Sequence, residues 1–181
     1  LFLHGGWMNL IFNMLFLWDF GDNVEDAMGH LRYLTFYVIC GIFATFSHAI
    51  MEASSQAPLI GASGAISGVL GAYLVLHPKA RVLVLFMNII PLRLPAIVVL
   101  GGWIGLQFLS LNSDDGTAWW AHIGGFLAGM ILVVPFRLKT VPLLDGFGRF
   151  GPDNPNVVDL AERKHARSIF PNTVSASSPA Q

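Results

Sequence analysis

Residues 59–68 read LIGASGAISG, and the apolar run that they open extends to Leu76 without a charged side chain. Apolar runs of about 16–20 residues, of which this is one, are long enough to cross a lipid bilayer. The small residues of the run suit two different roles. They allow membrane helices to pack closely, and they surround a serine, Ser63, that a neighbouring base could turn into a nucleophile. The choice between these roles depends on which polar residues lie at the same membrane depth.

The composition of the chain is that of a multi-pass membrane protein. Of its 181 residues, 54% are hydrophobic and only 12% are charged, about half the charged share of a typical soluble domain. The net charge of −1 provides no basic field that would attract nucleic acid. The single cysteine, Cys40, cannot form an intrachain disulfide, and no Cys/His spacing typical of a metal site is present.

Five apolar segments are expected to form membrane helices, because backbone polar groups in lipid must be satisfied within the segment. They cover approximately residues 7–20, 31–51, 62–76, 95–111 and 119–136. The stretch VLVLFMNIIPL, residues 82–92, precedes the fourth segment and predicts a piece of chain at the membrane interface.

The character of the chain changes at Arg137. Residues 137–181 contain Pro, Gly, Asn and Ser throughout and no spanning run, which predicts a solvated, largely disordered tail with a short helix over 157–167. We therefore expect two parts, a membrane core over 1–136 and a tail over 137–181. The chain begins at Leu1, mid-motif and without a signal-peptide pattern, and we expect that its N-terminus has been cut and that at least one span precedes it.

The distribution of basic residues predicts the orientation of the helices. Cytoplasmic loops carry an excess of Lys and Arg. The loop between the third and fourth segments holds Lys79, Arg81 and Arg93, and the fifth segment is followed directly by Arg137 and Lys139. The opposite loops hold Glu52, Asp114 and Asp115 and no Lys or Arg. The third and fifth segments therefore both run inward, and Ser63 and His122 both lie in a first turn near the outer face.

Ser63 and His122 each allow a structural and a functional interpretation. Serine is a small residue that permits close helix contact, and His122 follows Trp119 and Trp120, which are typical of an interfacial belt. An ionisable residue inside a membrane span is also a candidate functional residue. Histidine is suited to be a base near neutral pH, and the start of a helix offers free N–H groups to an oxyanion. Together, the two residues therefore favour the functional interpretation more strongly than either residue does alone.

Two stripes of small residues explain how this pair would meet. Such stripes let helix backbones approach closely, so facing stripes would bring Ser63 and His122 within side-chain reach. The stripe on the third segment is Gly64, Gly68 and Ala72, and the stripe on the fifth is Ala121, Gly125 and Gly129.

The first segment adds a second polar group near the outer face. Its start, HGGWMNLIFN, holds His4, Asn9 and Asn13. The two asparagines are four residues apart and share a helical face. Their amide N–H groups are candidates for an oxyanion hole, although interhelical hydrogen bonds between amides are common in membrane bundles. His4 is expected to be structural.

Three blocks of the chain together resemble the rhomboid intramembrane serine proteases. The blocks are HGGWMNLIFNMLFLWDFGDNVED, GASGAISGVLGAY and AHIGGFLAGM, and they occur in the order of that family. The resemblance covers about residues 1–136. It implies an all-α, polytopic transmembrane bundle of the rhomboid type, with five of six core helices present and the first one missing.

The resemblance also implies roles for individual residues. Ser63 is similar to the nucleophile of the family's G-x-S-G motif, and His122 to the general base of its A-H-x-x-G motif. Asn13, Asn9 and the backbone N–H of Ser63 are implied as oxyanion-hole donors. Structural or close-packing roles are implied for His4, Gly61, Gly64, Gly68, Gly125 and Gly129.

Two positions depart from the family pattern. Rhomboids often have a histidine at the position of Asn9, but an amide can still donate a hydrogen bond. Some relatives have an aromatic residue one turn after the nucleophile, stacked on the catalytic histidine, where this chain has Ser67. His122 is therefore expected to be held less firmly or by another group.

We expect an intramembrane serine endopeptidase, a hydrolase that uses a Ser–His dyad to cleave transmembrane substrates near the outer face. No carboxylate lies at catalytic depth, which favours a dyad over a triad. By analogy with the family, residues 103–118 would form a lateral gate. We expect the lipid bilayer and transmembrane proteins as partners and neither a cofactor nor a metal. The expected location is a bacterial plasma (inner) membrane with the tail in the cytoplasm.

Two other functions remain open at this point. A non-catalytic rhomboid-like protein would bind membrane helices without cleaving them, but inactive relatives generally lack the serine or the histidine, and both are present here. A transporter or scaffold fragment would need charges inside its spans, and the segments show none away from their ends.

Overall fold

The computed structural model describes residues 6–53, 62–86, 90–111 and 118–144. This part of the chain is mostly helical, which confirms the expected helical bundle. The chain begins with α1 (Trp7–Phe16), a π-helical turn (Leu17–Gly21) and α2 (Asp22–Met28). The remaining elements are α3 (His30–Met51), α4 (Ser63–Leu76), β1 (Arg81–Phe86), β2 (Ile90–Pro95), α5 (Ala96–Leu109) and α6 (Trp119–Phe136).

Two of these helices, α3 and α6, are long and apolar enough to cross a membrane by themselves. α4 and α5 are shorter apolar helices of 14 residues each, or about 21 Å at 1.5 Å per residue. The exposed side of the bundle carries large apolar side chains, among them Trp7 on α1, Phe46 on α3 and Ile131 on α6. A monomeric soluble protein rarely exposes so much apolar surface, whereas lipid would cover it.

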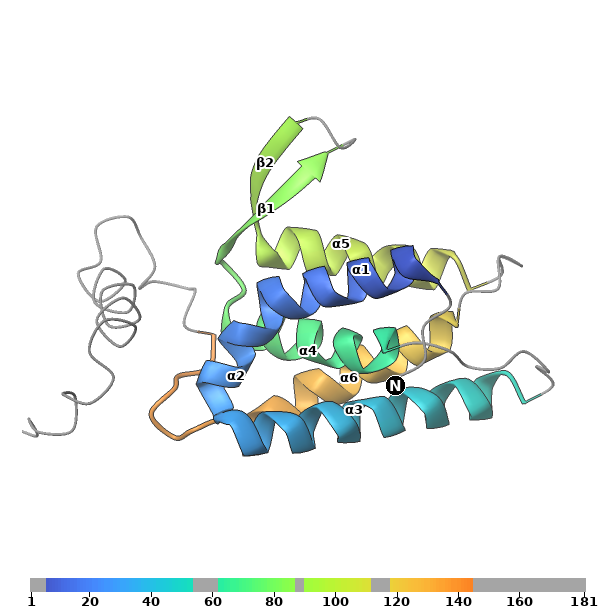
Figure 1. The fold of residues 1–181 in the computed structure, drawn as a ribbon, viewed down its shortest axis with the longest axis horizontal. Coiled ribbons are helices and arrows are strands. Elements are labelled where there is room, and N and C mark those ends of the chain that lie inside the picture. Colours follow the sequence, from blue (N-terminus) through green and yellow to red (C-terminus); the bar gives the residue numbers. More distant parts are fainter. Residues whose placement is uncertain (1–5, 54–61, 87–89, 112–117, 145–181) are drawn as a thin grey trace, which may run out of the picture. The chain divides into compact units, whose positions relative to one another are not determined.

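α4 is the central helix of the bundle. It packs against α3, α5, α6 and the π-helical turn (Figure 1), and every residue from Ala65 to Tyr73 is buried. Glycine allows this close packing, because a Cβ at Gly71 would lie 2.2 Å from the carbonyl oxygen of Phe126 on α6. A larger residue there would force the two helices apart.

A sharp turn and an aromatic pair also stabilise the bundle. Gly29, between α2 and α3, has a φ of 84°, a conformation that residues with a Cβ rarely adopt. The ring of Phe20 packs edge-on against Tyr73 of α4 at a centroid distance of 4.9 Å. The acidic residues Asp22, Glu25 and Asp26 lie in α2, and Glu25 pairs with His30 at the start of α3.

The segment before α5 forms a two-stranded antiparallel hairpin, with Arg81 opposite Pro95 and Phe86 opposite Ile90. The sequence predicted an interfacial piece here but not its form. The hairpin extends away from the helices (Figure 1). Its end leads directly into α5, whose first N–H, that of Ala96, donates to the carbonyl of Ala80 at 2.8 Å.

The residues after α6 turn back onto the bundle. The N–H of Leu138 donates to the carbonyl of Ala27 at 2.8 Å, and that of Leu144 donates to the carbonyl of Val75 at 2.9 Å. The first part of the segment expected to be a solvated tail is therefore attached to α2 and α4. The helix expected over 157–167 lies outside the described residues.

Candidate active site

Ser63 is the first residue of α4, and its side chain is half-buried. The hydrogen bonds of the helix begin with the N–H of Ile66, which donates to the carbonyl of Ala62 at 3.0 Å. The N–H groups of Ser63 and Gly64 are thus not used by the helix itself. They lie at its positive end, where a developing negative charge is stabilised.

His122 lies in the first turn of α6, opposite Ser63. The Nε2 atom of its imidazole is 2.9 Å from the Oγ atom of Ser63. At this distance the hydroxyl donates to Nε2 when the ring proton is on Nδ1. The two residues are 59 positions apart in the sequence, and the packing of α4 against α6 brings them together.

The stripes of small residues lie face to face and set this register. A Cβ at Gly125 would lie 2.0 Å from the carbonyl oxygen of Gly64, and a Cβ at Gly129 would lie 1.9 Å from that of Gly68. The backbones of α4 and α6 are therefore in direct contact over two helical turns next to the Ser63–His122 pair.

Gln107 on α5 is a site residue that the sequence did not single out. Its side chain is 5% exposed, and its Oε1 atom is 2.9 Å from Nδ1 of His122. The imidazole thus has a partner on each nitrogen, Ser63 on one side and Gln107 on the other. The available signal was a lone amide inside an apolar span, because such a group usually faces the bundle and needs a partner.

Two indole rings flank the imidazole. The ring of Trp103, one turn before Gln107 on α5, lies 5.9 Å from that of His122, and the ring of Trp119 lies edge-on at 6.3 Å. Ser67, at the position where some relatives have an aromatic residue, donates from Oγ to the carbonyl of Ser63 at 2.7 Å. His122 is therefore held by groups on α5 and at the start of α6 instead.

The two asparagines of α1 bond to each other. Nδ2 of the buried Asn13 donates to Oδ1 of the exposed Asn9 at 3.0 Å. An amide nitrogen carries two hydrogens, so Asn13 keeps one N–H for another acceptor. Within the described residues, no hydrogen bond joins either asparagine to Ser63. His4 and Gly61 lie outside the described residues.

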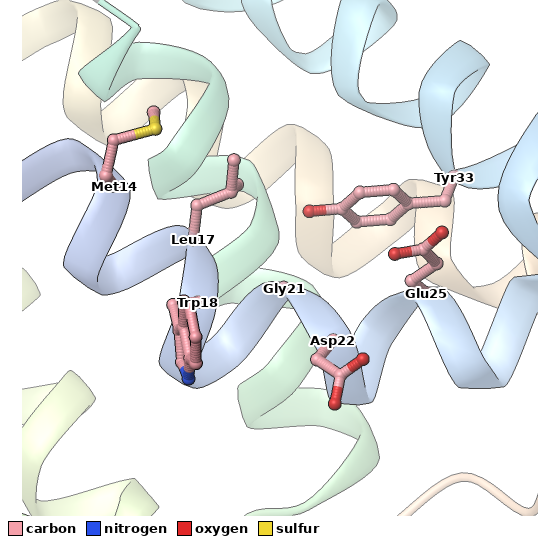
Figure 2. Close-up of a pocket in the computed structure, with 7 residues that line it drawn as sticks. All are labelled: Met14, Leu17, Trp18, Gly21, Asp22, Glu25 and Tyr33. Atoms are coloured by element: carbon pink, nitrogen blue, oxygen red, sulfur yellow. The ribbon is translucent and has the colours of Figure 1, made fainter. Parts of the chain in front are cut away.

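A separate hollow of about 520 Å³ lies beside the π-helical turn. Figure 2 shows Tyr33 pointing from α3 towards this turn, with the carboxylate of Glu25 beside it. The lining residues include neither Ser63 nor His122. Among the described residues, no group of three His, Cys, Asp or Glu side chains is placed to hold a metal ion.

Comparison with known proteins identifies the family. The Rhomboid domain profile matches residues 1–139. The chain is 34% identical to the rhomboid protease GluP of Bacillus subtilis over 93% of this chain and 34% of that protein. It is 31% identical to RHOMBOID-like protein 5 of Arabidopsis thaliana over 93% of this chain and 50% of that protein. It is also 30% identical to Rhomboid protein 1, mitochondrial, of Saccharomyces cerevisiae over 72% of this chain and 38% of that protein.

The chain thus spans between a third and a half of the length of these relatives. The family profile covers the five apolar segments and the pair formed by Ser63 and His122. The chain therefore belongs to the rhomboid family and is an integral membrane protein.

Proposed function

We propose that the protein is an intramembrane serine endopeptidase that cleaves transmembrane substrates near the outer membrane face. The observation that carries this proposal is the 2.9 Å contact between Oγ of Ser63 and Nε2 of His122. A serine hydroxyl becomes a useful nucleophile when an adjacent base takes its proton, and this distance is within the range that general-base catalysis requires.

The first half of the reaction forms an acyl-enzyme. Oγ of Ser63 attacks the carbonyl carbon of the scissile peptide while its proton passes to Nε2 of His122. The electron pair of the carbonyl moves to the oxygen, which becomes an oxyanion. When this intermediate collapses, the C–N bond breaks, and the imidazolium gives its proton to the leaving amine.

The second half returns the enzyme to its starting state. Water attacks the ester carbon as His122 takes one of its protons. The C–Oγ bond then breaks, and the proton returns to Oγ of Ser63. Water must reach Ser63 for this step, and its side chain is only half-buried at the start of α4. A water-filled cavity at this point would also accommodate the non-helical backbone that precedes the helix.

The oxyanion would be stabilised by the N–H of Ser63 and the remaining N–H of Asn13. Such donors are worth roughly 10²–10³ each in rate. Asn9 accepts the other N–H of Asn13, and we therefore propose that its main role is to orient the Asn13 amide. The substrate helix must unwind locally, which favours small or helix-breaking residues near the scissile bond. Residues 103–118 would act as the lateral gate for its entry.

The membrane that holds the protein is also part of this proposal. Its relatives include a bacterial protease and a mitochondrial protein, so family membership implies membrane integration without specifying the membrane. We propose a bacterial plasma membrane. Lys79, Arg81 and Arg93 between α4 and α5 would lie on the cytoplasmic side, which leaves Ser63 and His122 near the outer face.

A cleavage assay in liposomes tests the function. The protein at its native full length would be reconstituted with fluorogenic transmembrane peptides that carry small residues near the outer face. Cleavage that is absent from Ser63→Ala and from His122→Ala supports a protease. Binding of the peptides without cleavage by the unmodified protein would favour the alternative, a rhomboid-like protein that recognises membrane helices without cutting them.

A further inference from the structure

We propose that Gln107 is a positioning residue that fixes the tautomer and orientation of the His122 imidazole. The proposal rests on the proposed function, because it assigns a role to Gln107 within the same reaction. It adds a third member, a neutral amide, to what the sequence predicts as a two-residue dyad.

The requirement for such a group follows from the chemistry of the base. A neutral imidazole carries one proton, and Nε2 must be free of it to accept the proton of Ser63. The ring proton must therefore be on Nδ1, where it needs an acceptor, because a buried donor without one costs free energy. Oε1 of Gln107 lies 2.9 Å from Nδ1 and is an acceptor only.

The orientation of the Gln107 amide decides whether His122 can accept the proton of Ser63. With Oε1 towards the ring, Nδ1–H donates and Nε2 faces Oγ of Ser63 as an acceptor. With the amide reversed, its NH₂ group would donate to Nδ1, the ring proton would be on Nε2, and His122 could not take the proton of Ser63. Only the first arrangement is consistent with catalysis.

A neutral acceptor suits the location. A carboxylate inside a membrane span is costly, and no Asp or Glu occurs within α4, α5 or α6. An amide carbonyl can accept from Nδ1 both when the ring is neutral and when it becomes a cation, and the bond to the cation is the stronger one. Gln107 would thus hold the ring throughout the reaction without adding a charge.

α5 contacts the imidazole at two points. Gln107 contacts Nδ1 at the edge of the imidazole ring. Trp103 lies four residues earlier, and its ring centroid is 5.9 Å from that of the imidazole. Leu100 and Gln107 are buried on this helix, while Ile97 is 49% exposed. The inward face of α5 therefore positions the base, and the exposed Ile97 provides a control site on the same helix.

The experiment compares three variants of the full-length protein in liposomes. Gln107→Met keeps the length of the side chain but removes the strong acceptor. Gln107→Glu keeps an oxygen acceptor, whether the carboxyl is ionised or protonated. Ile97→Met is the matched control on the exposed face, outside the residues proposed as the gate. Each would be measured for kcat, KM and thermal stability.

We expect Gln107→Met to lower kcat by roughly 10–100-fold with KM within about twofold, as expected when a hydrogen bond in the buried base is lost. Gln107→Glu should recover most of this loss, and Ile97→Met should match the unmodified protein. Unchanged kcat in Gln107→Met would overturn the proposal. An equal loss in Gln107→Met and Gln107→Glu, with both folded, would also overturn it, because packing alone would then explain the effect.

Nitrogen-15 NMR of the histidines provides a readout that does not depend on activity. We expect His122 to carry its proton on Nδ1 in the unmodified protein and to shift towards the Nε2–H form in Gln107→Met. An Nε2–H form in the unmodified protein would overturn the proposal, even if Gln107→Met does not fold. If the unmodified protein shows no Ser63-dependent cleavage, the proposed function fails, while the tautomer still reports on Gln107.

Discussion

Gly68 on α4 and Gly129 on α6 approach so closely that a Cβ on Gly129 would lie 1.9 Å from the carbonyl oxygen of Gly68. Between one and two turns away, the same two helices place Ser63 and His122 at hydrogen-bond distance. The close packing of small residues and the geometry of the candidate site are therefore two aspects of one helix contact.

Gly129→Ala is expected to separate the two helices. The added methyl group must displace backbone, which typically costs about 1–3 kcal/mol in a packed core, and the pair at Ser63 would lose its register. We expect a lower melting temperature and a lower kcat. Gly101→Ala on α5 is the matched control, because a Cβ there meets nothing within 4 Å, and it should leave both quantities nearly unchanged or raise stability slightly. Full activity in Gly129→Ala would contradict this link.

Ser63→Ala and His122→Ala are each expected to reduce cleavage to background, a loss of roughly 10³-fold or more. Because the two residues act as one unit, the double variant should be no slower than either single one. The measurement is single-turnover cleavage in liposomes. A His122→Ala variant that retains activity close to that of the unmodified protein would exclude His122 as the base.

The two asparagines should differ in their effect on rate. Asn13→Ala removes a proposed oxyanion donor, so kcat should fall by roughly 10²–10³-fold. Asn9→Ala removes only the acceptor that orients Asn13, so we expect a smaller loss, roughly tenfold or less. Steady-state kinetics would separate them. Equal losses would mean that Asn9 is itself a donor to the oxyanion.

Gly29→Ala tests the turn between α2 and α3, far along the chain from the site. The φ of 84° at this position strains a residue that has a Cβ, at a cost of about 1–3 kcal/mol. We expect a lower melting temperature but an unchanged kcat at temperatures where the protein is folded. A melting temperature equal to that of the unmodified protein would show that the turn relaxes without cost.

Much of the helical framework could be predicted from the sequence, because long apolar runs bounded by charges have few other solutions in a bilayer. The expected segment 119–136 coincides with α6, and 31–51 differs from α3 by one residue. The hairpin of β1 and β2 could not be predicted, because a short apolar run with prolines does not distinguish a strand from an interfacial segment.

The candidate site could be predicted only in part. Ser63 and His122 follow from topology and from small-residue stripes, which are visible in the sequence. Gln107 follows only in part, because a lone amide in an apolar span indicates an inward-facing residue, whereas its partner depends on how α5 packs against α6. The pairing of Glu25 with His30 likewise depends on the turn at Gly29, which reverses the chain between the two residues.

Covalent labelling tests the central claim most directly. The full-length protein in liposomes would be treated with a fluorophosphonate, and the adduct would be mapped by mass spectrometry. Our account predicts a single adduct on Ser63 that is absent from both Ser63→Ala and His122→Ala. A folded protein that shows no adduct on Ser63, or an adduct that persists unchanged in His122→Ala, would contradict an activated serine at the start of α4.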